Sequence, residues 1–154
     1  MNILMVCLGN ICRSPIAEGV LQHLVAKNGL DWTVDSAGTS GYHNGALPDE
    51  RSIAVAKNYG IDLTPQRSRK FITDDFKRFD HIFVMDTSNY QNVIRLAKSQ
   101  KQKDKVKLLL NEVNPGGNQS VPDPYYEGGF EGVYKMIEAA CKAVVAKSKS
   151  PIKV

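Results

Sequence analysis

A chain of 154 residues with 42% hydrophobic and 23% charged residues has the composition of an ordinary single globular domain. Its formal net charge of +4 is modest, and its richest basic tract, residues 98–107, contains an aspartate and no aromatic residue, which argues against nucleic acid as a partner. No apolar run reaches the ~18 residues of a membrane span, and the apolar N-terminus lacks the features of a signal peptide, so we expect a cytoplasmic protein without membrane insertion.

The elements expected from hydrophobic periodicity alternate between strands and helices. Residues 2–8 are a continuous apolar run, the pattern of a strand covered on both faces. Residues 15–28 carry apolar side chains at helical spacing, with Pro15 in the first turn, where proline is tolerated, and Gly29 at the end. After these we expect a strand over 32–37, a helix over 48–59, a helical turn at 73–75, a strand over 81–85, a helix over 89–98, a strand over 106–110 and a helix over 127–147. Residues 61–78 are otherwise hard to place, and 148–154 are expected to be a frayed tail.

This alternation predicts an α/β fold, in which a parallel sheet is connected by right-handed crossovers and covered by helices on both faces. The four strands and their flanking helices give a three-layer α/β/α arrangement, and no linker interrupts it, so residues 1–154 are expected to form one domain. Ligands of such folds bind at the carboxyl ends of the strands, on the loops that lead into helices. That rule indicates three segments: residues 7–14, the loop after Ala37 and the loop before Glu127.

The loop between the first strand and the first helix, residues 7–14, has the features of an anion site. A tight loop at a helix start turns its backbone N–H groups into one concavity, where the helix dipole adds positive potential. Gly9 and Asn10 are the residues there best able to adopt positive φ, and Arg13 offers a planar guanidinium that suits two phosphate oxygens. No Gly-Lys-Ser/Thr sequence follows, so this is not the nucleotide-binding P-loop.

Cys7 stands at the mouth of this concavity. Helix N-termini and a nearby arginine favour the thiolate form of a cysteine, and Ser14 can donate a further hydrogen bond to the sulfur. The donors that stabilise a thiolate also suit the equatorial oxygens of a phosphoryl group under attack. The loop therefore predicts a phosphoryl-transfer site in which the nucleophile and the phosphate cradle belong to one segment.

The run from Val6 to Pro15, with Ala17-Glu18 after it, resembles the signature of the low-molecular-weight protein tyrosine phosphatases. The resemblance continues through Asp35-Ser36-Ala37-Gly38-Thr39-Ser40, Met85-Asp86 and Asp123-Pro124-Tyr125-Tyr126, and so covers nearly the whole chain. It implies a four-stranded parallel α/β/α domain that hydrolyses phosphotyrosine in proteins or peptides, and aryl phosphates, through a cysteinyl-phosphate on Cys7. It implies no cofactor and no metal. The implied phosphate-binding residues are Leu8, Gly9, Asn10, Ile11, Cys12, Arg13 and Ser14.

A cysteine-based site also needs an acid that protonates the leaving oxygen. Asp123, between two prolines on a loop expected to face Cys7, is the candidate, although an Asp-Pro pair can equally be a simple turn starter. The resemblance assigns Asp123 the acid role, followed by the activation of water in the second step.

The expected rim of the pocket is aromatic. Tyr125 and Tyr126 either form a wall against which a substrate ring packs or are plain core-edge tyrosines, and for Tyr126 the second interpretation is slightly preferred. The resemblance adds Leu8, Ile11 and Tyr42 to the pocket mouth. It further implies that Asn10 and Ser36, together with Ser14, hydrogen-bond behind the loop and keep it curled, although Asn10 could be only a turn residue.

Three cysteines without an export signal indicate free thiols rather than a disulfide framework. Cys12 is either a packed thiol or, as the resemblance favours, a partner that traps oxidised Cys7 as a disulfide. Cys141 falls on the apolar face of the last helix and is expected in the core. His23, His43 and His81 are scattered along the chain, and their spacing indicates no metal site.

Three alternative functions remain open. A thiol-coupled arsenate reductase of the same fold needs relay cysteines after the third strand, and residues 86–122 contain none. A protein-arginine phosphatase resembles this pattern with Thr at the position of Ile11 and lacks the paired tyrosines. A phosphate-binding module without turnover would be expected to lose Cys7 or Asp123, and both are present. The oligomeric state is not readable, and a monomer is the default expectation.

Overall fold

The computed structural model describes residues 1–149 and contains one sheet of four parallel strands. The strands are β1 (Asn2–Cys7), β2 (Thr33–Gly38), β3 (His81–Val84) and β4 (Val106–Leu108), and their spatial order is β2-β1-β3-β4. The chain leaves β1 toward one edge of the sheet to form β2 and then returns to form β3 on the other side of β1. In open α/β sheets, the carboxyl end of the strand where the order reverses is the usual ligand site. Here that end is Cys7.

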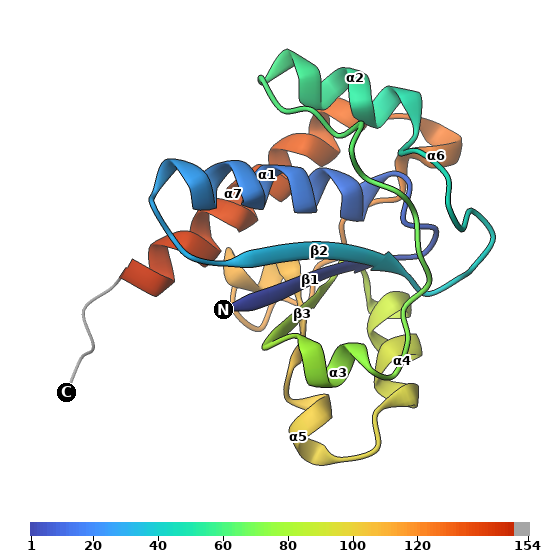
Figure 1. The fold of residues 1–154 in the computed structure, drawn as a ribbon, viewed down its shortest axis with the longest axis vertical. Coiled ribbons are helices and arrows are strands. Elements are labelled where there is room, and N and C mark those ends of the chain that lie inside the picture. The colour runs from blue at the N-terminus through green and yellow to red at the C-terminus, as the bar shows by residue number, and fades with distance from the viewer. Residues whose placement is uncertain (150–154) are drawn as a thin grey trace.

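Helices cover both faces of the sheet and confirm the predicted three layers (Figure 1). One layer contains α1 (Arg13–Lys27), α2 (Glu50–Asn58) and α7 (Phe130–Lys149), and the other contains α3 (Asp75–Arg78), α4 (Thr87–Leu96) and α5 (Gln100–Lys103). The 3₁₀ helix η1 (Leu109–Glu112) directly follows β4, and the short helix α6 (Pro124–Glu127) precedes α7.

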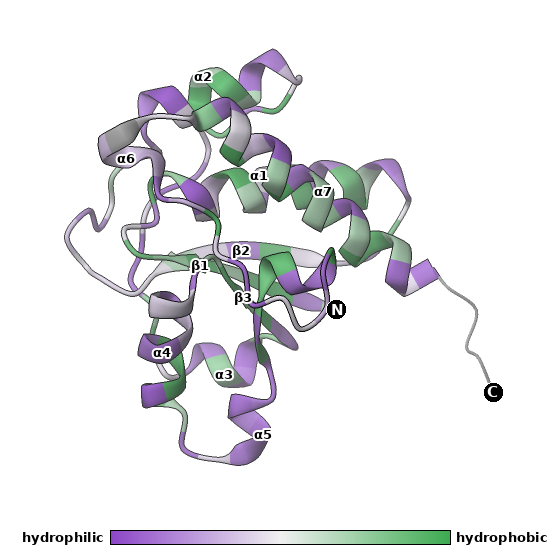
Figure 2. Ribbon diagram, turned by 180° about the vertical axis from the view of Figure 1, so that it is seen from behind, coloured by the Kyte–Doolittle hydropathy of each residue, from purple (hydrophilic) through white to green (hydrophobic). Residues whose placement is uncertain are grey.

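The side chains of β1 divide the core in two. Ile3, Met5 and Cys7 point into the cluster that includes α1 and α7, whereas Leu4 and Val6 point into the cluster on the side of α3 and α4. All five are at most 3% exposed, as the continuous apolar run predicted for a strand covered on both faces. Figure 2 shows apolar residues concentrated in the strands and in α1 and α7, while α5 is hydrophilic.

The element boundaries differ from the sequence-based expectation where short-range signals were weak. The helix expected over 127–147 is wrong at its start, because Gly128 and Gly129 adopt φ of 81° and 84° and separate α6 from α7. The prediction of a frayed tail over 148–154 was also wrong in part, because α7 continues to Lys149. Residues 150–154 lie outside the described residues. The first helix begins at Arg13 rather than Pro15, so Arg13 and Ser14 belong to its first turn.

The irregular segment 61–74, which periodicity could not place, is held by hydrogen bonds to other loops. Phe71 N donates to Gly38 O, and Gly38 N donates to Arg69 O, so the segment runs beside the end of β2. Ser68 N donates to Ala46 O and its carbonyl accepts from Gly45 N, which joins the segment to the loop after β2 as well. We call residues 61–74 the bracing segment.

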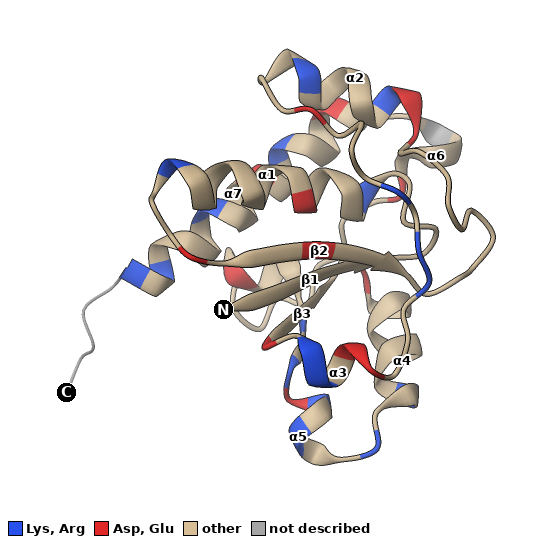
Figure 3. Ribbon diagram, viewed as in Figure 1, with Lys and Arg blue, Asp and Glu red and all other residues tan. Residues whose placement is uncertain are grey.

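The positive charges of the described residues are spread over several elements. Lys and Arg occur on most helices and on the bracing segment (Figure 3). Among residues 1–149, no helix has both the length and the apolar character that a membrane crossing requires.

Candidate active site

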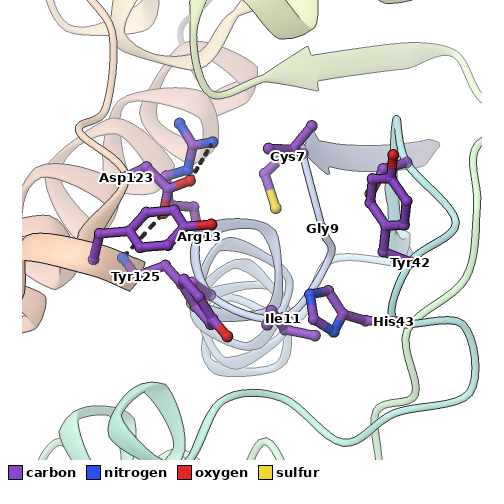
Figure 4. A pocket seen from close by; sticks show the side chains of 12 residues that line it. Cys7, Gly9, Ile11, Arg13, Tyr42, His43, Asp123 and Tyr125 are labelled. Atoms are coloured by element: carbon purple, nitrogen blue, oxygen red, sulfur yellow. Dashed lines mark hydrogen bonds and ion pairs between the residues drawn. The ribbon is translucent and has the colours of Figure 1, made fainter.

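A pocket of about 180 Å³ lies at the carboxyl end of β1 (Figure 4). Three segments that are distant in sequence meet there: the loop after β1, the loop after β2 and the loop that precedes α6. Its lining residues are Cys7, Leu8, Gly9, Ile11, Cys12, Arg13, Ser40, Tyr42, His43, Asp123, Tyr125 and Tyr126. The structure therefore brings together the predicted nucleophile, arginine, acid and rim residues. Asn10, Ser14 and Ser36 do not line the pocket, and their side chains are joined to one another by hydrogen bonds instead.

The loop 7–14 curls tightly against the end of β2. Asn10 adopts φ of 55°, as expected for this turn, whereas Gly9 has no positive φ. Thr39 N donates to Cys7 O and Ser40 N to Leu8 O, each at 2.9 Å. A Cβ atom at Gly38 would lie 2.8 Å from the carbonyl oxygen of Leu8, so the close approach of β2 requires glycine there.

A buried hydrogen-bond network surrounds the sulfur of Cys7. The Sγ atom lies 3.0 Å from Ser14 Oγ, and the Cys7 side chain points into the pocket (Figure 4). The side-chain amide of Asn10 donates to Ser14 Oγ at 2.8 Å and to Ser36 Oγ at 2.9 Å. Arg69 of the bracing segment donates its backbone N–H to Asn10 Oδ1 at 3.0 Å. Asn10 is thus more than a turn residue, because it joins the two serines that were predicted to support the loop.

Arg13 is only 2% exposed and is held from two sides. Its Nη1 atom donates to Asp86 Oδ2 at 2.7 Å and to the carbonyl of Val121 at 2.9 Å, while Nη2 lies 3.6 Å from Asp123 Oδ2. Burial opposes the charged form, but the anionic forms of Cys7, Asp86 and Asp123 outweigh it and raise the pKa of Arg13 above its usual value. The guanidinium is therefore a fixed cation beside the pocket.

Asp123 is both a helix cap and a carboxylate that lines the pocket. It caps α6, since its Oδ1 accepts a hydrogen bond from Tyr125 N at 3.1 Å, and its other carboxylate oxygen faces Arg13. The side chain is 37% exposed and lines the pocket opposite the loop after β2 (Figure 4). Asp123 therefore begins the turn into α6 and also presents a carboxylate to the pocket.

The rim is aromatic and extends beyond the residues expected there. The preferred interpretation of Tyr126 as a core-edge tyrosine is wrong, because its side chain is mostly exposed and lines the pocket. Tyr42 and Tyr126 are 90% and 88% exposed, and the rings of Tyr125 and Tyr126 meet edge to face at 4.9 Å. His43 faces Tyr125 across the opening, with ring centroids 6.3 Å apart (Figure 4). Arg51 of α2 donates to Tyr125 O at 3.0 Å and so supports that wall.

The cysteines differ in their surroundings. Cys12, at the start of α1, is 4% exposed and lines the same pocket as Cys7. Burial, with Asp49 and Cys7 adding, raises the pKa of Cys12 to about 12, so its thiol is protonated at neutral pH. Cys141 is fully buried in the core beneath α1 and α7, as predicted.

Comparison with known proteins assigns the family. The family model described as low molecular weight phosphotyrosine protein phosphatase matches residues 2–152. The chain belongs to this family. A curated member from Schizosaccharomyces pombe, named low molecular weight phosphotyrosine protein phosphatase, is 47% identical over 135 residues, which are 86% of this chain and 85% of that one. The human protein of the same name is 40% identical over 152 residues, 96% of this chain and 95% of its own.

Solved structures of this phosphatase family share the fold. A protein tyrosine phosphatase from Entamoeba histolytica, with Hepes in its active site, superposes with a TM-score of 0.88 at 38% identity and 97% coverage of both chains. The Drosophila arginine phosphatase superposes with a TM-score of 0.90 at 36% identity, covering 97% of this chain and 99% of that one. Family members named for two substrates are thus about equally similar, so the fold alone does not separate tyrosine from arginine.

Two residues of the phosphatase pocket were not predicted from the sequence: Asp86 as the anchor of Arg13, and His43 in the rim. A signal for Asp86 existed: it follows β3 directly, at the same edge of the sheet as Cys7. His43 had no comparable signal, because its place depends on how the loop after β2 folds back over Gly9.

Proposed function

We propose that the protein hydrolyses phosphotyrosine in proteins or peptides through a covalent phosphate on Cys7. The observation that carries the proposal is the placement of one sulfur, one buried guanidinium and one carboxylate around a single pocket with an aromatic rim. The sulfur lies at the base of a loop whose backbone turns into the start of α1, where an anion is stabilised.

In the first step, the backbone N–H groups of the loop 7–14 and Arg13 hold the phosphate oxygens. The thiolate of Cys7 attacks phosphorus, forming an S–P bond while the bond from phosphorus to the tyrosine oxygen breaks. Asp123, protonated at this stage, gives its proton to the departing oxygen, and tyrosine leaves. The donors that stabilise the resting thiolate then serve the charge on the phosphoryl group.

In the second step, Asp123 acts as a base. Its carboxylate takes a proton from water, and the water oxygen attacks phosphorus as the S–P bond breaks. Inorganic phosphate leaves, the Cys7 thiolate is restored, and Asp123 is again protonated. The side chains that these steps use, those of Cys7, Arg13 and Asp123, all line the pocket.

The pocket walls favour a flat substrate. Tyr125 and Tyr42 lie on opposite sides of the opening, and Ile11 lines the pocket between them, so all three offer surface to a ring (Figure 4). The competing substrate is phosphoarginine, because the Drosophila arginine phosphatase is similar to this chain over nearly its whole length.

A direct assay separates these functions. Phosphate release should be measured from a phosphotyrosine peptide, from the same peptide with phosphoarginine, and from an aryl phosphate with orthovanadate as inhibitor. We expect kcat/KM for phosphotyrosine to exceed that for phosphoarginine by roughly 10²-fold or more, the size that pocket discrimination commonly reaches. Faster release from phosphoarginine would reassign the substrate, and no release from any of the three would leave a phosphate-binding module.

We also propose that the pair Cys7 and Cys12 makes the enzyme redox-sensitive. Hydrogen peroxide would oxidise the Cys7 thiolate to a sulfenic acid, and the Cys12 thiol would then displace water from it to form a disulfide, which external thiols reduce. Both cysteines line the same pocket, which favours a reaction between them. We further propose that the enzyme is cytoplasmic, where thiols such as Cys7 are kept reduced and disulfides are transient. We propose that it acts as a monomer.

The redox proposal predicts that Cys12 protects activity. After mild peroxide treatment, thiols should restore most of the activity of the native protein, whereas a Cys12→Ser variant should recover far less of its own starting activity, because Cys7 proceeds to irreversible sulfinic acid. Peptide mapping should find the Cys7–Cys12 link in the oxidised native protein. Equal recovery in both proteins would remove this role of Cys12.

A further inference from the structure

The segment that carries Asp123, residues 122–126, is attached to the rest of the molecule at few points. We call it the acid loop. Within the described part of the chain, a single hydrogen bond joins it to another element: Arg51 Nη2 of α2 donates to Tyr125 O at 3.0 Å. α2 lies beside α6 (Figure 1). On the far side of α6, Gly128 and Gly129 adopt positive φ, so α6 does not continue into α7.

The ion pair between Arg13 and Asp123 is not sufficient to hold the acid loop during the reaction. The distance from Arg13 Nη2 to Asp123 Oδ2 is 3.6 Å, and the attraction depends on the charge of the carboxylate. In the first step proposed above, Asp123 carries a proton and is neutral, while Arg13 holds the phosphate of the substrate. A contact that is independent of the charge on Asp123 must then keep the acid close to the leaving oxygen.

Arg51 is also connected to the loop that carries Cys7. Its Nε and Nη2 atoms donate to the two carboxylate oxygens of Asp49, each at 3.0 Å. Asp49 caps α2 and donates its own backbone N–H to Ile11 O at 2.7 Å. The hydrogen bonds from Arg51 lower the pKa of Asp49 below its usual value, so Asp49 is ionised at neutral pH. The start of α2 is therefore fastened to the loop of the nucleophile.

Two aromatic rings fix the orientation of the Arg51 guanidinium, although the side chain is half exposed. Its Cζ atom lies 4.6 Å from the centroid of the Phe130 ring and 5.6 Å from that of Tyr125. Phe130 is buried at the start of α7. Cation–π contacts and a bidentate carboxylate together use the planar shape of the guanidinium. Arg51 is therefore a fixed link between α2 and the acid loop.

We propose that Arg51 is a positioning residue for the phosphatase reaction: it links the Cys7 loop, through Asp49, to the acid loop, and so sets the distance between Cys7 and Asp123. The inference rests on the proposed function. The link ends close to the acid, because Tyr125 accepts from Arg51 at its carbonyl and donates from its N–H to Asp123 Oδ1. A displacement of about 1 Å in a reacting group can cost on the order of 10²-fold in rate.

The test is Arg51→Met, which keeps an unbranched apolar side chain against Phe130 and removes the hydrogen-bond donors. The quantity to measure is kcat/KM for aryl phosphates whose phenols differ widely in acidity. For phenyl phosphate, whose leaving oxygen needs a proton, we expect a loss of roughly 10- to 100-fold. For dinitrophenyl phosphate, whose leaving group needs none, the loss should stay below about 3-fold. Equal losses across the series would overturn the proposal.

A matched control and a double-mutant cycle separate this role from general damage. Arg78 is also about half exposed, ion-paired with Asp75 and placed over the ring of Phe79, but it belongs to α3 in the other layer. Arg78→Met should leave the dependence on the leaving group unchanged. If Arg51 acts through Asp123, adding Arg51→Met to Asp123→Asn should lower kcat/KM for phenyl phosphate no further. A further loss as large as that in the native background would contradict the proposal.

Hydrogen exchange tests the link without turnover. In the peptide that spans residues 123–128, backbone N–H exchange should be roughly 3-fold faster or more in Arg51→Met than in the native protein, and unchanged in Arg78→Met. Exchange in β1 should be the same in all three proteins. Unchanged exchange of the 123–128 peptide in Arg51→Met would overturn the proposal. A native protein without phosphatase activity would contradict the proposed function, and the exchange rates would still decide whether Arg51 holds the acid loop.

Discussion

A Cys7→Ser variant should lose turnover by on the order of 10⁴-fold or more while keeping its fold and its affinity for phosphate. A serine hydroxyl is a weak nucleophile unless a base removes its proton, and the side chain hydrogen-bonded at this position is the hydroxyl of Ser14, which is not a base. The phosphate contacts come from the loop backbone and Arg13, which the substitution does not remove. The measurements are kcat on an aryl phosphate and the Kd of inorganic phosphate by calorimetry.

Cys12→Ser is the matched control for this experiment, because it makes the same chemical change at another thiol of the same pocket. Its activity should stay far above that of Cys7→Ser. Mass spectrometry of rapidly quenched native enzyme should also show a phosphate group on the peptide that contains Cys7. Substantial activity in Cys7→Ser would sink the covalent mechanism.

Asp123→Asn should lower kcat for phosphotyrosine by ~10²–10⁴, the usual range for the loss of a general acid. The loss should depend on the leaving group. An acidic nitrophenol leaves without a proton, so the first step should suffer less for nitrophenyl phosphate than for phosphotyrosine. A burst of nitrophenol followed by slow turnover would report the second role, the activation of water. Asparagine can still cap α6, so the loop should keep its conformation.

Asp86→Asn is the comparison that separates chemistry from anchoring. Asp86 Oδ2 accepts a hydrogen bond from Arg13 Nη1 at 2.7 Å. Asp86 Oδ1 accepts from Asn89 N and so caps α4, a role that asparagine can retain. This variant should weaken phosphate binding for all substrates alike, as a rise in KM without dependence on the leaving group. If Asp123→Asn also lost activity equally for every leaving group and showed no burst, Asp123 would only shape its loop, and Asp86 would become the acid to test.

The sequence predicted the layers of the fold and the centre of the site because both depend on short-range patterns. The apolar run before Cys7 is readable as a buried strand, and a glycine-containing loop before a proline-started helix is readable as an anion site. For Asp123 the neighbouring prolines indicated only a turn, and its assignment to the site came from the family resemblance.

The parts that could not be predicted depend on contacts between distant segments. The bracing segment has no periodicity, because its conformation is held by partners such as Gly38 and Ala46 on other loops. Glu18 reads as an ordinary helix residue until Ser36, in β2, is seen to donate to it. The break between α6 and α7 was missed although Gly128 and Gly129 signal it, because the apolar spacing beyond them dominated the assignment.

The bracing segment has a consequence for substrate length. Ser68 Oγ donates to Gly9 O and Arg69 N holds Asn10 Oδ1, while the backbone of Ser68 is paired with the loop that carries Tyr42. One stretch of chain is therefore fastened both to the floor of the pocket and to its aromatic opening. The distance between the floor of the pocket and its aromatic rim is therefore fixed. A phosphate reaches the Cys7 sulfur only when the side chain that carries it is about as long as the pocket is deep. We therefore expect hydrolysis of a phosphoserine peptide, whose phosphate sits close to its own backbone, to be much slower than that of the same peptide with phosphotyrosine.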